Sequence, residues 1–299
     1  MNLLILAGFG CGTIALLWIA QTLALLAIGK RDCLLLPYRH DGESSLVRWS
    51  MKLALHAGLL SMIFLYPWVI GFDPWQYHLE RIVPLEWWHV LAGVGLTAGL
   101  LSIPLIISLA VGWVKFENRY RASKLIYKLV RSFLIPIPLT LVEEPLFRGV
   151  VQEQFLAVFP SSAAGWTFAV VLSSLIFASV HFVKPQKRSL LPFIGLFGLG
   201  VILSLAYIRT GHHYLLPMTI HGTGVWFVQM TRSTTRYGGP AWLVGHASYP
   251  ICGAMGLTAM TAMGVIIMSG YQPGDASAAS PSTAGQGLFG HQRSVPERK

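Results

Sequence analysis

Charged residues are scarce in this 299-residue chain. They make up 11% of it, whereas hydrophobic residues make up 54%. A soluble globular domain carries about 25% charged residues, so this chain has too few to cover a surface in water. The composition therefore excludes an ordinary soluble protein. It predicts an integral, multi-pass protein of a cell or inner membrane.

Cysteine is also rare. Cys11, Cys33 and Cys252 are odd in number and show no C-x-x-C spacing, which argues against a disulfide framework or a thiolate metal site. The zinc-protease pattern H-E-x-x-H is absent as well. The net charge is +10, yet no basic stripe is interleaved with aromatic residues. We therefore expect the lipid bilayer as a partner and no nucleic acid.

Long apolar runs dominate the sequence, and a spanning helix needs about 20 mostly apolar residues. The first run has no basic leader of the kind found in a cleaved signal peptide, so we expect it to span. The eight candidate spans are 3–29, 53–72, 88–114, 132–151, 161–183, 190–208, 214–230 and 249–269. The predicted fold is an all-α, polytopic membrane helix bundle of about eight transmembrane helices.

Lysine and arginine residues are concentrated in every second connection between these spans. Sixteen fall in every second connection, namely 30–52, 115–131, 184–189 and 231–248, against two in the others. Because positive charge collects on the cytoplasmic side, both chain ends are predicted to lie outside. Residues 115–131 mix basic and apolar side chains, which predicts a short interfacial helix leading into the fourth span.

The sequence divides into four parts. The predicted N-terminal transmembrane helices occupy 1–114, and a core occupies 115–230. One further transmembrane helix is expected in 231–269. Residues 270–299 are rich in Gly, Ser, Ala and Pro, which predicts a disordered tail.

The fourth span carries ionisable residues at membrane depth, where each costs about 2.5–3.5 kcal/mol to insert. On a helix, Glu144 and Arg148 are four residues apart and can neutralise one another. Glu143 is turned away from Arg148 and keeps no cation on its own helix. Such a carboxylate suits a general base. The alternative is an ion pair that only locks helix packing, which leaves Glu143 unexplained.

Two later spans each hold a histidine. His181 ends the string Phe177-Ala-Ser-Val-His181, and His221 stands beside Gly222 and Gly224. Each alone could be a hydrogen-bond partner between helices. Together, a buried glutamate and two histidines could polarise a water molecule or hold a metal such as zinc.

These three strings, in this order, resemble the signature of the CPBP intramembrane protease family, which includes type II CAAX prenyl endopeptidases and lysostaphin-resistance-protein-like members. The family pattern is E-E-x-x-x-R, then F-x-x-x-H, then H-x-x-x-N or a similar polar residue. The resemblance covers about residues 130–230 and implies a four-helix catalytic core. Val225 stands where the family has its polar residue.

The resemblance also implies roles. Glu143 would activate the attacking water with help from His181, and His221 would stabilise the oxyanion. Glu144 and Arg148 would be the pair that holds Glu143 in place. Val225 removes one expected oxyanion donor, and a lost donor can cost about 10²–10³ in rate. Thr223 is the nearest substitute in the sequence. The implied activity is hydrolysis of a membrane-associated peptide or protein.

The mechanism and the functional class both stay open at this stage. A metal and a metal-free glutamate mechanism both fit the residues, with a preference for the latter. A proton- or ion-coupled transporter is the second functional class. A catalytically silent relative acting as a membrane partner or immunity factor is the third, favoured by Val225.

Other candidate sites are set aside. His212 and His213 fit an interfacial position, and Ser173 and Ser174 lack a base in register. The serine hydroxyls are expected to bond to the preceding helical turn.

Overall fold

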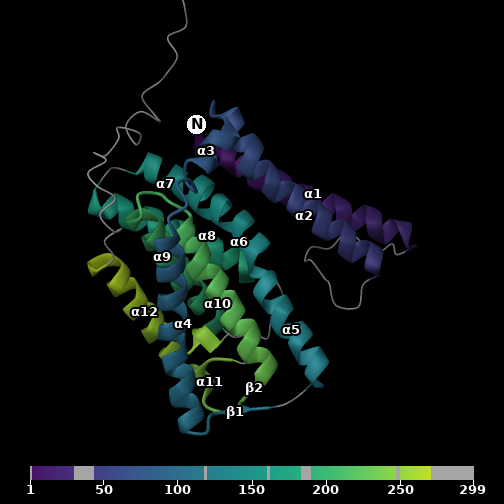
Figure 1. Ribbon diagram of the computed structural model, residues 1–299. Helices are drawn as coiled ribbons and strands as arrows, with labels where there is room; N and C mark the ends of the chain where they lie inside the picture. Colours follow the sequence, from purple (N-terminus) through teal and green to yellow (C-terminus); the bar gives the residue numbers. More distant parts are fainter. Residues whose placement is uncertain are drawn as a thin grey trace, which may run out of the picture.

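The computed structural model describes residues 2–29, 44–117, 120–159, 162–182, 190–246 and 250–270. The predicted tail, from residue 271 on, lies outside them. The described chain is almost entirely helical (Figure 1). In chain order the elements are α1 (Asn2–Ala27), α2 (Ser45–Val69), α3 (Pro74–Leu79), α4 (Trp87–Ala110), β1 (Val114–Phe116), α5 (Ala122–Leu134), α6 (Pro136–Glu144), η1 (Pro145–Gln152), α7 (Glu153–Val158), α8 (Ala163–Phe182), α9 (Leu191–Arg209), α10 (Leu215–Thr234), β2 (Thr235–Tyr237), α11 (Ala241–Val244), η2 (Pro250–Cys252) and α12 (Ala254–Ser269).

The all-α polytopic bundle is confirmed, and the chain is an integral, multi-pass membrane protein. Within the described residues, six helices are long and apolar enough to cross a membrane, where the sequence predicted eight. The six are α1, α2, α4, the continuous run from α5 to α7, α8 and α9. The other two predicted spans correspond to α10 and α12.

Helices α10 and α12 are not among these six helices, for different reasons. Helix α10 has 20 residues but is too polar, and it packs against α4, α5, α6 and α9. A helix enclosed by other helices does not need a lipid-compatible surface, so polar residues are tolerated there. Helix α12 is apolar but has only 16 residues, about 24 Å at 1.5 Å per residue. That is short of the hydrocarbon thickness of about 30 Å.

The run from Ala122 to Val158 is helical throughout its 37 residues. Its first part, α5, begins inside the segment 115–131 that was predicted as an interfacial helix, but residues 115 and 116 belong to β1 instead. Most side chains of α5 are exposed. Pro136 occupies the first turn of α6, where a missing N–H is harmless. At Pro145 the helix widens into the π-helix η1. The proline removes a backbone donor, and a π-helical turn accommodates that interruption without ending the helix.

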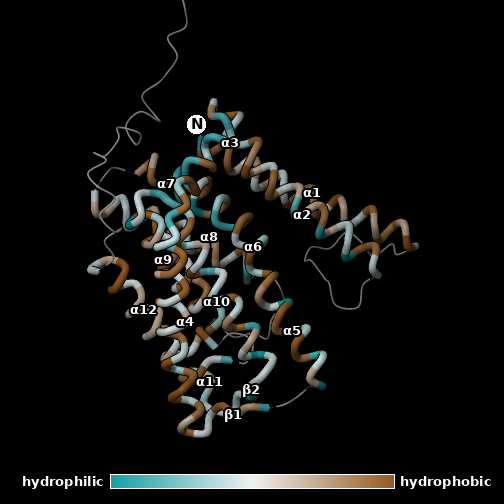
Figure 2. The backbone as a smooth tube through the Cα atoms, viewed as in Figure 1, coloured by the Kyte–Doolittle hydropathy of each residue, from teal (hydrophilic) through white to brown (hydrophobic). Residues whose placement is uncertain are grey.

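Helices α1 and α2 form a hairpin that leans away from the other helices (Figure 1). They pack mainly on one another, and the end near α3 meets η1 and α7. The main apolar core lies between α4, η1, α8, α9, α10 and α12, and α2 contributes Ile63 to it. Figure 2 shows hydrophobic residues along the length of α1 and α2 and hydrophilic ones around α3 and α7. The core helices therefore position the site, and the hairpin adds to one end of them.

A polar cluster joins α3 to α7, α9 and α10. The Tyr207 hydroxyl donates to Glu153 Oε1 at 2.7 Å, and Arg81 Nε donates to the Tyr207 oxygen at 3.0 Å. His212 Nδ1 also contacts Glu153 Oε1. In the same cluster the Tyr214 hydroxyl donates to His78. Local spacing does not predict these partners, because they come from segments more than 50 residues apart.

His78 makes the cluster sensitive to acid. Its Nε2–H donates to the Ile63 carbonyl at 2.9 Å, and its Nδ1 accepts from the Tyr214 hydroxyl at 2.9 Å. This pattern uses the neutral ring. Burial lowers the pKa of His78 from 6.5 to about 4. The folded state therefore stays unprotonated at pH values where the unfolded chain binds a proton.

We expect stability to fall as the pH drops from 6.5 towards 4, by at most about 3 kcal/mol from this group. Thermal unfolding of the detergent-solubilised chain across this range measures it. His78→Gln keeps a donor and an acceptor but cannot take up a proton, so its stability should depend less on pH. Equal pH dependence of the two proteins would contradict the assignment.

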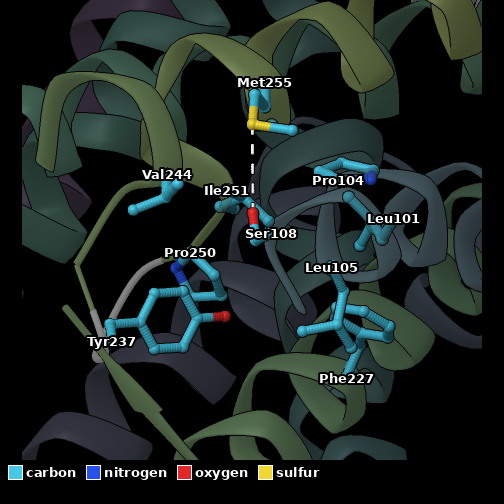
Figure 3. Close-up of a pocket in the computed structure, with 11 residues that line it drawn as sticks. Leu101, Pro104, Leu105, Ser108, Phe227, Tyr237, Val244, Pro250, Ile251 and Met255 are labelled. Atoms are coloured by element: carbon cyan, nitrogen blue, oxygen red, sulfur yellow. Dashed lines mark hydrogen bonds between the residues drawn. The ribbon is translucent and has the colours of Figure 1, made fainter. Parts of the chain in front are cut away.

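Strands β1 and β2 pair antiparallel beyond the ends of α4 and α10. Beside them, α4, α10 and α12 enclose a cavity of about 20 Å³ (Figure 3). Its lining is mostly apolar, and the Ser108 hydroxyl donates to Met255 Sδ at 3.9 Å. The volume suits one water at most, and an apolar lining gives a water few partners. None of the predicted site residues lines this cavity.

Candidate active site

The two adjacent glutamates lie at the end of α6, just before the π-helix. Neighbouring helical positions are about 100° apart, so their side chains leave the helix in different directions. Glu144 is fully buried, whereas the Glu143 side chain is 15% exposed. Single π-helical insertions are frequent at functional sites. One carboxylate is thus committed to the protein interior and the other is open to a small ligand such as water.

Glu143 lies between the two predicted histidines. Its Oε2 is 3.4 Å from His181 Nε2 and 3.6 Å from His221 Nε2. The three groups come from α6, α8 and α10. Within the described part of the chain, Glu143 Oε2 is buried and has no hydrogen-bond partner. The structure therefore brings together the three side chains on which the sequence hypothesis depends.

Both imidazoles are oriented by a bond on their other nitrogen. His181 Nδ1 lies 2.7 Å from the Phe177 carbonyl oxygen, which can only accept. His221 Nδ1 lies 2.6 Å from Glu144 Oε1. The proton of each neutral ring is thereby placed on Nδ1. Each Nε2 is left facing Glu143 as an acceptor, or as a second donor once the ring is protonated.

Glu144 and Arg148 form the ion pair that their spacing predicted. Arg148 Nε is 3.2 Å from Glu144 Oε2, and both side chains are fully buried. Arg148 Nη1 donates to Ser204 Oγ at 2.7 Å and to Gln152 Oε1 at 3.4 Å. Removing a single partner from such a pair leaves a bare charge in the protein interior.

Glu144 makes a second contact that its spacing from Arg148 does not predict. Helical spacing predicts one partner for Glu144, Arg148, whereas the structure shows two, one on each carboxylate oxygen. Glu144 thus links the guanidinium to His221, which stands on another helix. The spacing in α6 contains no signal for this second contact, because His221 is 77 residues away.

Two polar residues of the site escaped the sequence analysis. Gln152 follows Arg148 by four residues, so helical spacing could have identified it. Ser204 lies in an apolar stretch of α9 and has no sequence signal. The set-aside serines, Ser173 and Ser174, both donate to the Val170 carbonyl in the preceding turn, as expected.

The position of Val225 is confirmed to be one turn beyond His221 on α10, where its side chain is half-buried. Thr223 is a poor substitute donor. Two residues along a helix correspond to about 200°, which turns Thr223 away from the face that carries His221. The sequence neighbour of His221 is therefore not its spatial neighbour.

The other histidines set aside lie in a different place. His212 contacts Glu153 in the polar cluster near α3, and His213 packs edge-on against His89 with ring centroids 5.3 Å apart. Among the residues that the structure describes, no group of three or more His, Cys, Asp or Glu side chains is arranged to hold a metal ion. The reaction proposed for this site therefore uses only the side chains described above.

Comparison with known proteins gives one family. Residues 122–227 match the model of the type II CAAX prenyl endopeptidase family described as Rce1-like. The match extends from α5 into α10 and includes all five predicted site residues. No curated protein and no solved structure matches the chain. The matched segment contains the parts of α6, α8 and α10 that carry Glu143, His181 and His221.

Proposed function

We propose that this chain is an intramembrane endopeptidase whose catalytic base is Glu143. Its residues 122–227 match the model of the Rce1-like type II CAAX prenyl endopeptidases. The family implies a protease in general. The observation that carries the finer proposal is the convergence of the Glu143 carboxylate with two imidazole Nε2 atoms inside the bundle.

In the proposed reaction, Glu143 takes a proton from a water molecule, whose oxygen attacks the carbonyl carbon of the scissile peptide bond. The proton then passes from Glu143 to the leaving amine as the C–N bond breaks. Glu143 Oε2 makes no hydrogen bond in the described structure, so this oxygen is available to accept the proton of a water molecule. His181 is 27% exposed, so this side of the site is the one open to water.

His221 is proposed to stabilise the oxyanion. In the resting ring the proton is on Nδ1, so His221 serves the oxyanion only once its Nε2 gains a proton during the reaction. Glu144, which accepts from Nδ1 at 2.6 Å, supports the positive charge that then forms, as a carboxylate supports a catalytic histidine. Electrostatic groups placed before the reaction cost no reorganisation when charge develops.

The substrate is proposed to be a membrane-associated peptide or protein that reaches the site from the predicted cytoplasmic side. His181 is the penultimate residue of α8, and the basic connection 184–189 follows it. That connection lies outside the described residues, so its contribution to substrate binding is not part of the proposal.

A transporter is the second candidate, because the continuous helical run from α6 to α7 carries several charged residues. Glu144, Arg148 and Glu153 are buried, and Glu143 is 15% exposed. Between these glutamates in the sequence, Arg148 is a fixed cation that does not deprotonate. A permanent positive charge obstructs the passage of protons and cations, so the endopeptidase is favoured.

The proposal is tested by reconstituting the purified chain into vesicles with a library of membrane-associated peptides. Mass spectrometry of the products identifies cleavage, and a pH-sensitive dye inside the same vesicles reports proton flux. Cleavage that survives a zinc chelator is the expected result. Proton flux without any cleavage would instead favour the transporter.

Val225 provides a further test. Val225→Asn places a polar side chain on the same helix face as His221, one turn away. If the missing donor limits the reaction, kcat should rise by about 10²-fold or more, the size expected for an oxyanion donor. Val225→Leu is the matched control. Activity that appears only in Val225→Asn would identify the natural chain as a silent relative, whereas equal activity would show that Val225 is not limiting.

A further inference from the structure

Ser204 is the nearest partner of the buried guanidinium. Its hydroxyl oxygen accepts from Arg148 Nη1 at 2.7 Å, and the residue is fully buried on α9. Close packing of α8 against α9 places it there, because a Cβ at Gly200 would lie only 3.0 Å from Ser174 Cβ. The close packing of α8 and α9 therefore brings Ser204 to Arg148, although neither of these helices carries a glutamate.

A continuous set of contacts leads from Ser204 to the proposed base. Arg148 binds Ser204 through Nη1 and Glu144 through Nε. The other oxygen of Glu144 binds His221 Nδ1, and His221 Nε2 faces Glu143 at 3.6 Å. Each contact fixes the position or the protonation of the next group, and Glu144 and Arg148 are fully buried.

The Arg148 guanidinium depends strongly on Ser204. Within the described residues, its Nη2 is buried without a hydrogen-bond partner. Nη1 has a short bond to Ser204 and a longer one, 3.4 Å, to Gln152 Oε1. Without the serine hydroxyl, only Gln152 would hold this end of the side chain, and a small rotation of the guanidinium would shift Glu144.

We propose that Ser204 is a positioning residue for the reaction. It acts through Arg148 and Glu144 to keep the proton of His221 on Nδ1, so that Nε2 faces Glu143. The expected change in kcat rests on the proposed function. The expected change in the tautomer of His221 does not, because it can be measured without any catalytic activity.

The experiment compares wild type, Ser204→Ala and Ser204→Ala/Gln152→Ala in detergent with ¹⁵N-labelled histidine. The His221 signal is assigned by its loss in His221→Gln. We expect the Nδ1–H tautomer in wild type, a mixture in Ser204→Ala and a larger change in the double variant, because Gln152 is the remaining acceptor. Ser102→Ala on α4 is the control, because this half-buried serine donates to the Ala98 carbonyl outside the site; it should leave the spectrum unchanged.

Kinetics are measured on the same proteins. We expect Ser204→Ala to lower kcat about 10- to 100-fold, the range for partners that orient a functional ligand, with KM unchanged. A loss of thermal stability with wild-type kcat and the wild-type tautomer would show that Ser204 only packs the helices. If wild type cleaves no peptide while the tautomer still changes, the positioning contact holds and the proposed function is wrong.

Discussion

Glu143→Gln should abolish peptide cleavage while the protein remains folded. Glutamine has nearly the same shape as glutamate but cannot accept the proton of the attacking water. Loss of a general base lowers rates by about 10²–10⁴, and here the same group also delivers the proton to the leaving amine. We therefore expect kcat to fall by about 10³-fold or more.

The fold should tolerate this change because Glu143 Oε2 makes no hydrogen bond in the described structure. Removing a buried negative charge also removes its desolvation cost, so the melting temperature should stay the same or rise. Glu80→Gln, at an exposed carboxylate of the same chain, is the control for loss of one charge. Cleavage by Glu143→Gln at the wild-type rate would falsify the assignment of the base.

Breaking the Glu144–Arg148 pair should have the largest effect on stability. Arg148→Met leaves Glu144 as an anion in the interior, and Glu144→Leu leaves the cation there. Loss of one partner of a buried pair costs about 3–5 kcal/mol. For a chain of this size such a loss lowers the melting temperature by about 10 °C.

The double variant Glu144→Leu/Arg148→Met separates charge from packing. It removes both charges and keeps comparable side-chain volume, so we expect it to regain most of the stability that either single variant loses. Thermal unfolding in detergent measures all four proteins. Activity should stay absent in the double variant, because His221 no longer has a carboxylate on Nδ1. Additive losses in the double variant would show that the two charges do not depend on one another.

The membrane class was predictable from the sequence because it follows from composition. Too little charge for a water-facing surface, together with long apolar runs, leaves few alternatives to a helical membrane protein. The number of spans was less predictable. A hydropathy pattern cannot tell whether a polar run such as 214–230 faces lipid or protein, and α10 is enclosed by four other helices.

Part of the site was predictable as well. The spacing of Glu144 and Arg148 predicted their ion pair, since helical geometry is local. The second contact of Glu144, with His221, had no local signal. Thr223, the substitute donor, lies about 200° around the helix from His221, so nearness in sequence does not make it a neighbour in space.

By itself the sequence determined that this protein lies in a membrane, that it is helical, and which of its residues are too polar for their surroundings. These properties depend on residue type and on spacing within one helix, where geometry is fixed by the backbone. The tertiary structure alone decided that Glu143 meets two imidazoles, that Glu144 serves both Arg148 and His221, and that Ser204 supports them. Such contacts depend on how separate helices pack, and packing is decided by side chains distant in the chain.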